Sequence, residues 1–210
     1  QDLEQPMESI EDKIYNSIKR RKKGAIIFAS DFSHLYGGIA VNKALERLAG
    51  ANKIIRLSRG IYCRPQIDTE LGLGVIYPTL EEIAEAIAKR DKSRIMPTGD
   101  YALNRLGLST QVPMNAVYYT DGAPRNIKIY NGRGITFLRV VPKRLAFKNK
   151  LSAMLTFALQ EIGKGNLSEE QDKRVKDLLT QVPQNVIAED YPLMPEWIRA
   201  LIKRSYAELS

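Results

Sequence analysis

Apolar side chains recur at helical spacing near the start of the chain. Between Met7 and Lys22 they stand three or four positions apart, which predicts a first helix that begins near Ser9. The apolar run 24–28 follows, and it is long enough for one buried strand.

Two further helices are predicted after this strand. Ser30 and Asp31 are favourable N-cap residues for a short second helix, which should end at the paired glycines 37–38. A third helix is predicted from Ile39 to about Ala49, with its apolar side chains on one face. The side chains on its opposite, polar face are Asn42, Lys43, Glu46 and Arg47.

A hairpin is predicted directly after the third helix. Two β-prone runs, 53–58 and 60–64, meet at Arg59 and Gly60, where the glycine can supply the positive φ of a tight turn. Two short helices joined by a glycine turn and followed by a hairpin are typical of a winged helix-turn-helix domain. We therefore expect this fold at the N-terminus.

Such a domain places its third helix in the major groove of duplex DNA and its hairpin against the backbone or the minor groove. Asn42 can pair with adenine, while Lys43 and Arg47 can reach guanine edges or phosphates. The expected DNA-binding residues are Ser33, Asn42, Lys43, Arg47, Arg56 and Arg59, together with Arg20 and Arg21 at the end of the first helix.

The charge distribution agrees with an anionic partner. The 32 lysines and arginines outnumber the 24 acids, and residues 13–64 alone hold twelve bases against two acids. A second stretch, 122–160, contains eight bases and no acid. From it we expect a second basic surface made of Arg125, Lys128, Arg139, Lys143 and Arg144. The alternative interpretation of both stretches is a solvated face.

The remainder of the chain predicts a second domain. Residues 65–78, with two prolines and two glycines, are typical of a linker. We expect a winged helix-turn-helix domain at 9–66, a linker at 67–78 and an α+β domain at 79–210. In this larger domain, helices are predicted at 79–90, 97–106, 150–162, 168–181 and 195–208. The spacing of Thr79 with Glu82, and of Ser168 with Gln171, predicts a capping box at the start of two of them. An antiparallel meander is predicted at 116–120, 126–130 and 134–141, with turns at 121–122 and 131–132.

Several function classes lack their sequence signals. No apolar stretch approaches the roughly 20 residues of a membrane span, and the first twelve residues hold five acids and no base, so we expect a cytoplasmic protein without a signal peptide. One cysteine, Cys63, and one histidine, His34, allow neither an internal disulfide nor an ordinary structural zinc site. Because phosphate-loop, nucleophile-elbow and clustered-acid motifs are also missing, we expect no cofactor and no catalytic site.

Two segments resemble a known family. The sequence from Arg94 to Pro113, followed by Val117 to Gly122, is similar to the central signature of AbiEi-like antitoxins of bacterial type IV toxin-antitoxin systems, and 57–62 resembles their wing. The resemblance covers about residues 9–145. It implies an N-terminal winged helix that binds operator DNA and represses its own operon, and a C-terminal domain that counters a nucleotidyltransferase toxin. It assigns the segment 98–111 to the antitoxin domain.

Two alternatives remain open at the sequence level. The winged helix can deliver substrate to a nucleic-acid-processing enzyme, although clustered acids are scarce in the second domain. The chain can instead bind RNA, with Tyr118, Tyr119 and Tyr130 as stacking platforms beside Arg125 and Lys128. The sequence does not predict whether the protein is a monomer or a dimer.

Overall fold

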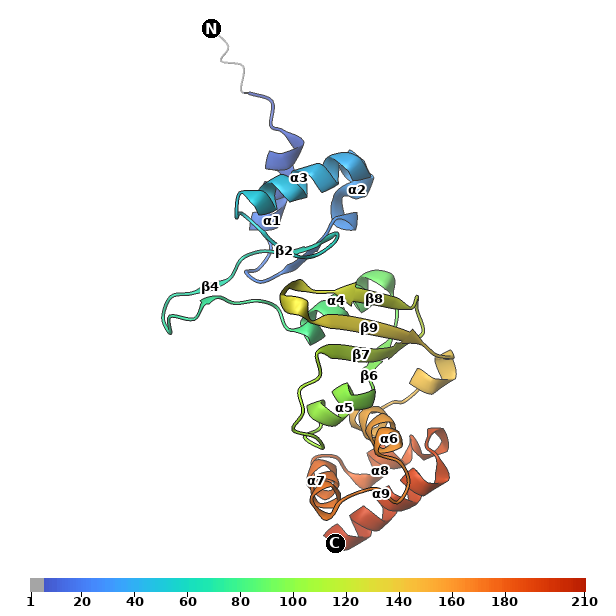
Figure 1. The fold of residues 1–210 in the computed structure, drawn as a ribbon. Helices are drawn as coiled ribbons and strands as arrows, with labels where there is room; N and C mark the ends of the chain where they lie inside the picture. The colour runs from blue at the N-terminus through green and yellow to red at the C-terminus, as the bar shows by residue number, and fades with distance from the viewer. Residues whose placement is uncertain (1–5) are drawn as a thin grey trace. The chain divides into compact units, whose positions relative to one another are not determined.

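The computed structural model describes residues 6–210 and has an α+β fold (Figure 1). The acids Asp2 and Glu4, which contribute to the acidic start noted above, lie outside the described residues. The described residues divide into two compact units: residues 6–86 with 128–131, and residues 87–127 with 132–210. Each unit is described by itself.

The first unit begins with three helices and three strands. In chain order these are α1 (Ile10–Lys19), β1 (Ile26–Phe28), α2 (Ser30–Tyr36), α3 (Gly38–Gly50), β2 (Ile55–Ser58) and β3 (Ile61–Cys63). The strands form an antiparallel sheet in the order β1-β3-β2. The helices pack through one buried cluster that includes Ile14, Ile18, Val41, Leu45 and Leu48. The predicted helices and strands of this region are therefore confirmed, with α1 shorter than predicted.

The start of α2 differs from the prediction. No side chain caps this helix, so the assignment of Ser30 or Asp31 as its cap is wrong. The Asp31 carboxylate instead accepts a hydrogen bond from the Phe28 amide at 3.1 Å and pairs with Arg21 at 2.8 Å. The Asp31 carboxylate therefore links β1 to the residues that follow α1, and it does not cap the first turn of α2.

The proline- and glycine-rich segment after β3 contains a small hairpin. Its strands β4 (Ile67–Asp68) and β5 (Gly74–Val75) pair antiparallel, with Ile67 opposite Val75. The Asp68 carboxylate accepts hydrogen bonds from the amides of Glu70 and Leu71, which organises the turn. The chain then enters α4 (Leu80–Asp91), where the predicted capping box between Thr79 and Glu82 is confirmed.

The sheet of the second unit is mixed rather than a plain antiparallel meander. Its strands, in the order β6-β7-β9-β8, are β6 (Ile95–Pro97), β7 (Asn115–Thr120), β9 (Gly134–Arg139) and β8 (Arg125–Lys128). β6 and β7 are antiparallel, whereas β7 and β9 are parallel. The predicted hairpin turn at 121–122 does not form, because Gly122 lacks a positive φ and Asp121 accepts hydrogen bonds from Arg94 instead.

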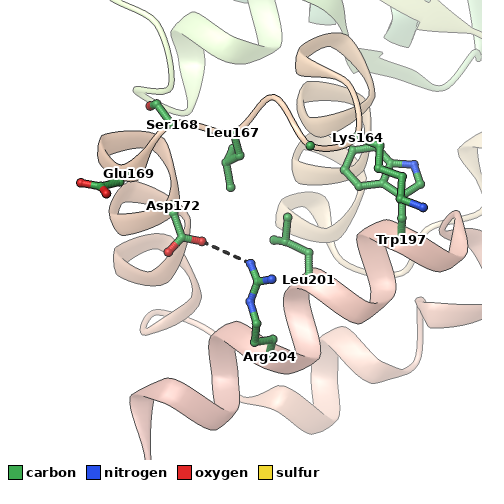
Figure 2. Close-up of a pocket in the computed structure, with 9 residues that line it drawn as sticks. Lys164, Leu167, Ser168, Glu169, Asp172, Trp197, Leu201 and Arg204 are labelled. Atoms are coloured by element: carbon green, nitrogen blue, oxygen red, sulfur yellow. Dashed lines mark ion pairs between the residues drawn. The ribbon is translucent and has the colours of Figure 1, made fainter.

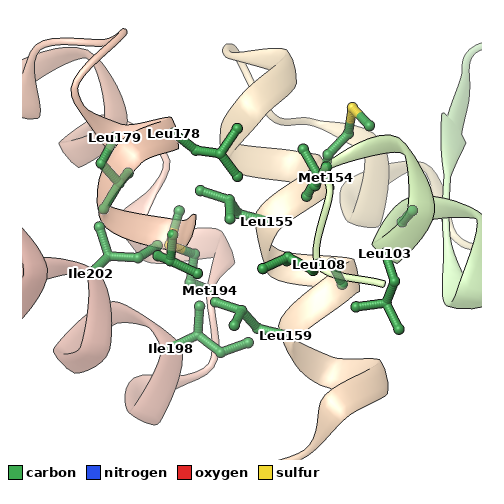
Figure 3. Close-up of a cluster of buried hydrophobic side chains, with 14 of the residues drawn as sticks. Leu103, Leu108, Met154, Leu155, Leu159, Leu178, Leu179, Met194, Ile198 and Ile202 are labelled. Carbon is green, nitrogen blue, oxygen red and sulfur yellow. The ribbon is translucent and has the colours of Figure 1, made fainter. Parts of the chain in front are cut away.

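Helices complete the second unit. They are α5 (Gly99–Arg105), α6 (Lys150–Ile162), α7 (Glu169–Leu179), α8 (Gln184–Ala188) and α9 (Glu196–Leu209), with single 3-10 turns at Pro142–Leu145 and Tyr191–Leu193. A further 3-10 turn at Tyr130–Gly132 spans the division between the units in the sequence. Leu155 and Leu159 of α6 meet Leu178 of α7 and Ile198 of α9 in the largest buried cluster (Figure 3). Figure 3 also shows Leu103 and Leu108 beside α6, so the signature segment 98–111 contributes to this core.

Candidate nucleic-acid interface

The exposed face of α3 carries the side chains that the sequence assigns to DNA. Val41, Ala44, Leu45 and Leu48 are buried, and this orientation leaves Asn42, Lys43 and Arg47 exposed. Within the described residues, these three side chains have no hydrogen-bond or ion-pair partner. Their polar groups are therefore available to an external ligand.

A single residue separates α2 from α3. Gly37 has φ +81° and follows Tyr36, the last residue of α2. An L-residue with a side chain would be strained at this φ, so glycine permits the abrupt change of direction. Ser33 lies in α2, where its hydroxyl faces the Ser30 carbonyl at 3.4 Å, and it is only partly exposed.

The hairpin between β2 and β3 presents two arginines. Gly60 has the positive φ that the sequence predicted, +71°, and Arg59 beside it is exposed at the tip. Arg56 is exposed on β2, opposite the buried Tyr62. The Ala29 amide donates a hydrogen bond to the Gly60 carbonyl at 3.0 Å, which fastens this tip to the residue before α2.

The two arginines at the end of α1 differ in their surroundings. Arg20 is exposed and has no partner among residues 6–210. Arg21 pairs with Asp31, and its guanidinium lies 5.5 Å from the centre of the Phe32 ring. Arg21 is thus part of the scaffold, and a phosphate contact would have to compete with Asp31.

The second basic stretch is less open than its composition suggested. Arg125, Lys128, Arg139, Lys143 and Arg144 are all exposed. However, Arg125 pairs with Asp91 at 3.0 Å, and the Arg144 guanidinium lies 4.8 Å from the centre of the Tyr119 ring. Asp91, which is distant in the sequence, therefore neutralises one of these charges, and an aromatic ring packs against another.

Tyr118 cannot serve as a platform for RNA bases. It is 1% exposed, and its hydroxyl donates a hydrogen bond to the Tyr101 hydroxyl. Tyr130 is half-buried with its ring against Tyr77. The prediction of a tyrosine stacking surface is wrong for Tyr118, because the alternation of β7 points this side chain into the core.

Cys63 and His34 have no sign of a reactive role. Cys63 is buried, and burial raises the pKa of its thiol to about 11, so it is a small apolar core residue. His34 is exposed on α2. Within residues 6–210, no group of three His, Cys, Asp or Glu side chains could hold a metal ion. Nor does any described helix have the length and hydropathy to cross a bilayer.

Two cavities lie among the helices of the second unit, away from these basic residues in the sequence. One of about 510 Å³ has Leu167, Trp197 and Leu201 on its walls. Asp172 and Arg204 point toward each other there, with their closest atoms 3.7 Å apart (Figure 2). Asp172 also pairs with Lys176 at 3.0 Å, so this carboxylate is held between two cations.

A second cavity, of about 460 Å³, involves the signature segment. Ser109, Thr110 and Gln111 line it together with the start of α7. Asn104 donates a hydrogen bond to the Gln111 carbonyl, and Gln171 donates one to the Leu108 carbonyl. These bonds hold the loop 106–111, which agrees with a framing role for Asn104 rather than a reactive one.

A family model matches residues 13–187, which is most of the chain. The chain belongs to the DUF6088 family. This family is described as one of unknown function. The crystal structure of RV2827C protein from Mycobacterium tuberculosis is similar to this DUF6088 chain with a TM-score of 0.47 and 13% sequence identity, over 91% of this chain and 75% of that one. No curated protein matches the sequence.

Proposed function

We propose that the first unit is a winged helix-turn-helix that binds duplex DNA in a sequence-specific manner. The observation that carries this proposal is the exposed face of α3, on which Asn42, Lys43 and Arg47 have no partner within the described residues. An amide and two cations on one helix face suit the donor and acceptor groups of the major groove and its flanking phosphates.

The strand order supports the same proposal. A sheet ordered β1-β3-β2 packs beside three helices, and the β2–β3 turn carries Arg59. In a winged helix this turn is the wing, which contacts the DNA backbone or the minor groove. Arg56 on β2 and Arg20 after α1 are exposed cations that can add contacts to the phosphate backbone.

The test is selection of bound duplexes from a random DNA library by the full chain. We expect enrichment of one sequence motif. Asn42→Ala should relax the preference at an adenine position, because one bidentate contact contributes about 1–3 kcal/mol of discrimination. Asn185→Ala, which changes an exposed asparagine of α8, should select the wild-type motif. Enrichment no greater than that of an unrelated protein would refute the proposal.

The biological role that we propose is transcriptional autorepression combined with antitoxin activity. It rests on the resemblance of segments 57–62 and 94–122 to AbiEi-like antitoxins, and the partner that it implies is a nucleotidyltransferase toxin. Two measurements in cells test it: repression of a reporter behind the operon's upstream DNA, and rescue of growth when the neighbouring gene is induced. A neighbouring gene without toxicity would remove the antitoxin role and leave the DNA-binding proposal unaffected.

A further inference from the structure

The hairpin made by β4 and β5 exposes an unusual amount of apolar surface. Leu71, Leu73 and Ile67 are 79%, 68% and 61% exposed, and Val75 and Ile76 are about 40% exposed. We call the side chains of Ile67, Leu71, Leu73 and Val75 the hairpin patch, whereas Ile76, the residue after Val75, points to the opposite face of the strand. The exposed surface of the patch is on the order of 500 Å², a size at which the largest apolar patch of a monomer is often an interaction site.

The hairpin has a defined conformation without a core of its own. Its shape depends on the pairing of Ile67 with Val75, the Ile76 amide bonded to the Gln66 carbonyl at 2.8 Å, and the turn that Asp68 organises. Figure 1 shows it extending away from α1, α2 and α3 of its unit. An isolated two-stranded hairpin is marginally stable in water, so a partner that covers it would also stabilise it.

The charge near the patch excludes nucleic acid as that partner. Between Arg64 and Lys89 the chain contains no lysine or arginine, and the hairpin itself carries Asp68 and Glu70. A phosphate backbone would be repelled here, and an anionic membrane surface would be repelled for the same reason. The patch therefore suits a protein surface.

We propose that a second copy of this chain covers the hairpin patch, so that the protein is a two-fold dimer. A two-fold axis can place the apolar face of this hairpin against the same face of a second copy. Two patches would together remove about 1,000 Å² of apolar surface from water, which is close to the lower end of the standard range of about 1,200–2,000 Å² for stable interfaces.

Sedimentation equilibrium of the full chain, between 1 and 100 µM and without DNA, tests the dimer directly. We expect the wild-type mass to approach twice the 23.7 kDa of one chain. The double variant Leu71→Glu with Leu73→Glu should remain monomeric over the whole range, since it replaces the most exposed apolar side chains of the patch and adds four carboxylates to those of Asp68 and Glu70 in the two copies. Val112→Glu is the matched control, because it changes a side chain that is 72% exposed outside the patch.

Circular dichroism checks that the double variant is folded, which we expect because Leu71 and Leu73 make no buried contact. A wild-type chain that stays monomeric at 100 µM would overturn the proposal, and so would a double variant that dimerises as tightly as the wild type. Because the assay contains no DNA, its outcome is independent of whether the first unit binds DNA.

Discussion

The salt dependence of DNA binding follows from the number of exposed cations on the proposed interface. Five of them have no acidic partner within the described residues: Arg20, Lys43, Arg47, Arg56 and Arg59. Arg21 is left out because Asp31 already neutralises it. If all five contact phosphates, the logarithm of the association constant falls with the logarithm of salt concentration with a slope of about −4.5 per bound chain.

This slope has a measurable consequence. Between 50 and 200 mM salt, the affinity should fall about 500-fold. Arg59→Ala removes one phosphate contact, so the slope should become shallower by about one, to roughly −3.6, for every duplex sequence. Lys173→Ala is the control, because it removes one positive charge from an exposed position of α7.

Fluorescence anisotropy with a labelled duplex, repeated at five salt concentrations, measures these slopes. A wild-type slope shallower than about −2 would mean that at most two of these cations meet phosphates, and it would refute the proposed interface. Equal slopes for Arg59→Ala and Lys173→Ala would refute the role of the hairpin tip. A dimer that engages both copies would instead double the slope of the wild type.

Three further predictions test other parts of the molecule. Ile39 is 78% exposed on α3, where it can contact a thymine methyl group. We expect Ile39→Ala to weaken binding to the selected motif about five-fold and to make its affinity the same for thymine and for uracil, which lacks this methyl group. A variant that still prefers thymine to uracil as strongly as the wild type would contradict this prediction. The Asp190 carboxylate is 1% exposed and accepts hydrogen bonds from the backbone amides of Lys148 and Asn149 at the start of α6. Asp190→Ala should therefore lower the free energy of unfolding by about 2–3 kcal/mol and Tm by roughly 5–10 °C in calorimetry, and Asp190→Asn should lower both by less. Partial burial of Asp121 opposes its ionisation, yet hydrogen bonds from the Arg94 side chain and backbone lower the pKa of its carboxyl group below the unfolded value of 3.8. The ionised carboxylate therefore stabilises the fold above pH 3.8, and this stabilisation disappears as the pH falls through the lower folded pKa. Asp121→Asn should reduce the loss of unfolding free energy, measured by urea denaturation, as the pH is lowered, and an unchanged loss would contradict the assignment.

The sequence predicted the first unit well because its signals are local. Apolar periodicity located α3, and the positive φ of Gly60 gave the hairpin turn. The capping boxes of α4 and α7 formed where the spacing of Thr79 with Glu82 and Ser168 with Gln171 placed them. Each of these features depends on side chains within four positions, which sequence patterns describe directly.

The errors share a different cause, which is contact between distant positions. Asp121 was expected in a hairpin turn, but Arg94, 27 positions earlier, holds it and the strands pair in a mixed sheet. Arg125 was expected in an unneutralised basic stretch, but Asp91 pairs with it. Side-chain alternation along β7 buries Tyr118, and the face that this alternation buries depends on strand order rather than on composition.

The first unit presents two surfaces of opposite chemistry, and this separation explains how both proposals can hold together. The exposed cations of α3 and of the β2–β3 turn attract a polyanion, whereas the hairpin patch is apolar and flanked by Asp68 and Glu70. A surface that binds DNA must stay hydrated and positive, and a surface that binds a second copy must lose water and carry little charge. Because Leu71 and Leu73 are distinct from the proposed DNA-contacting residues, dimerisation can change how many DNA half-sites are bound together without changing how α3 reads each one.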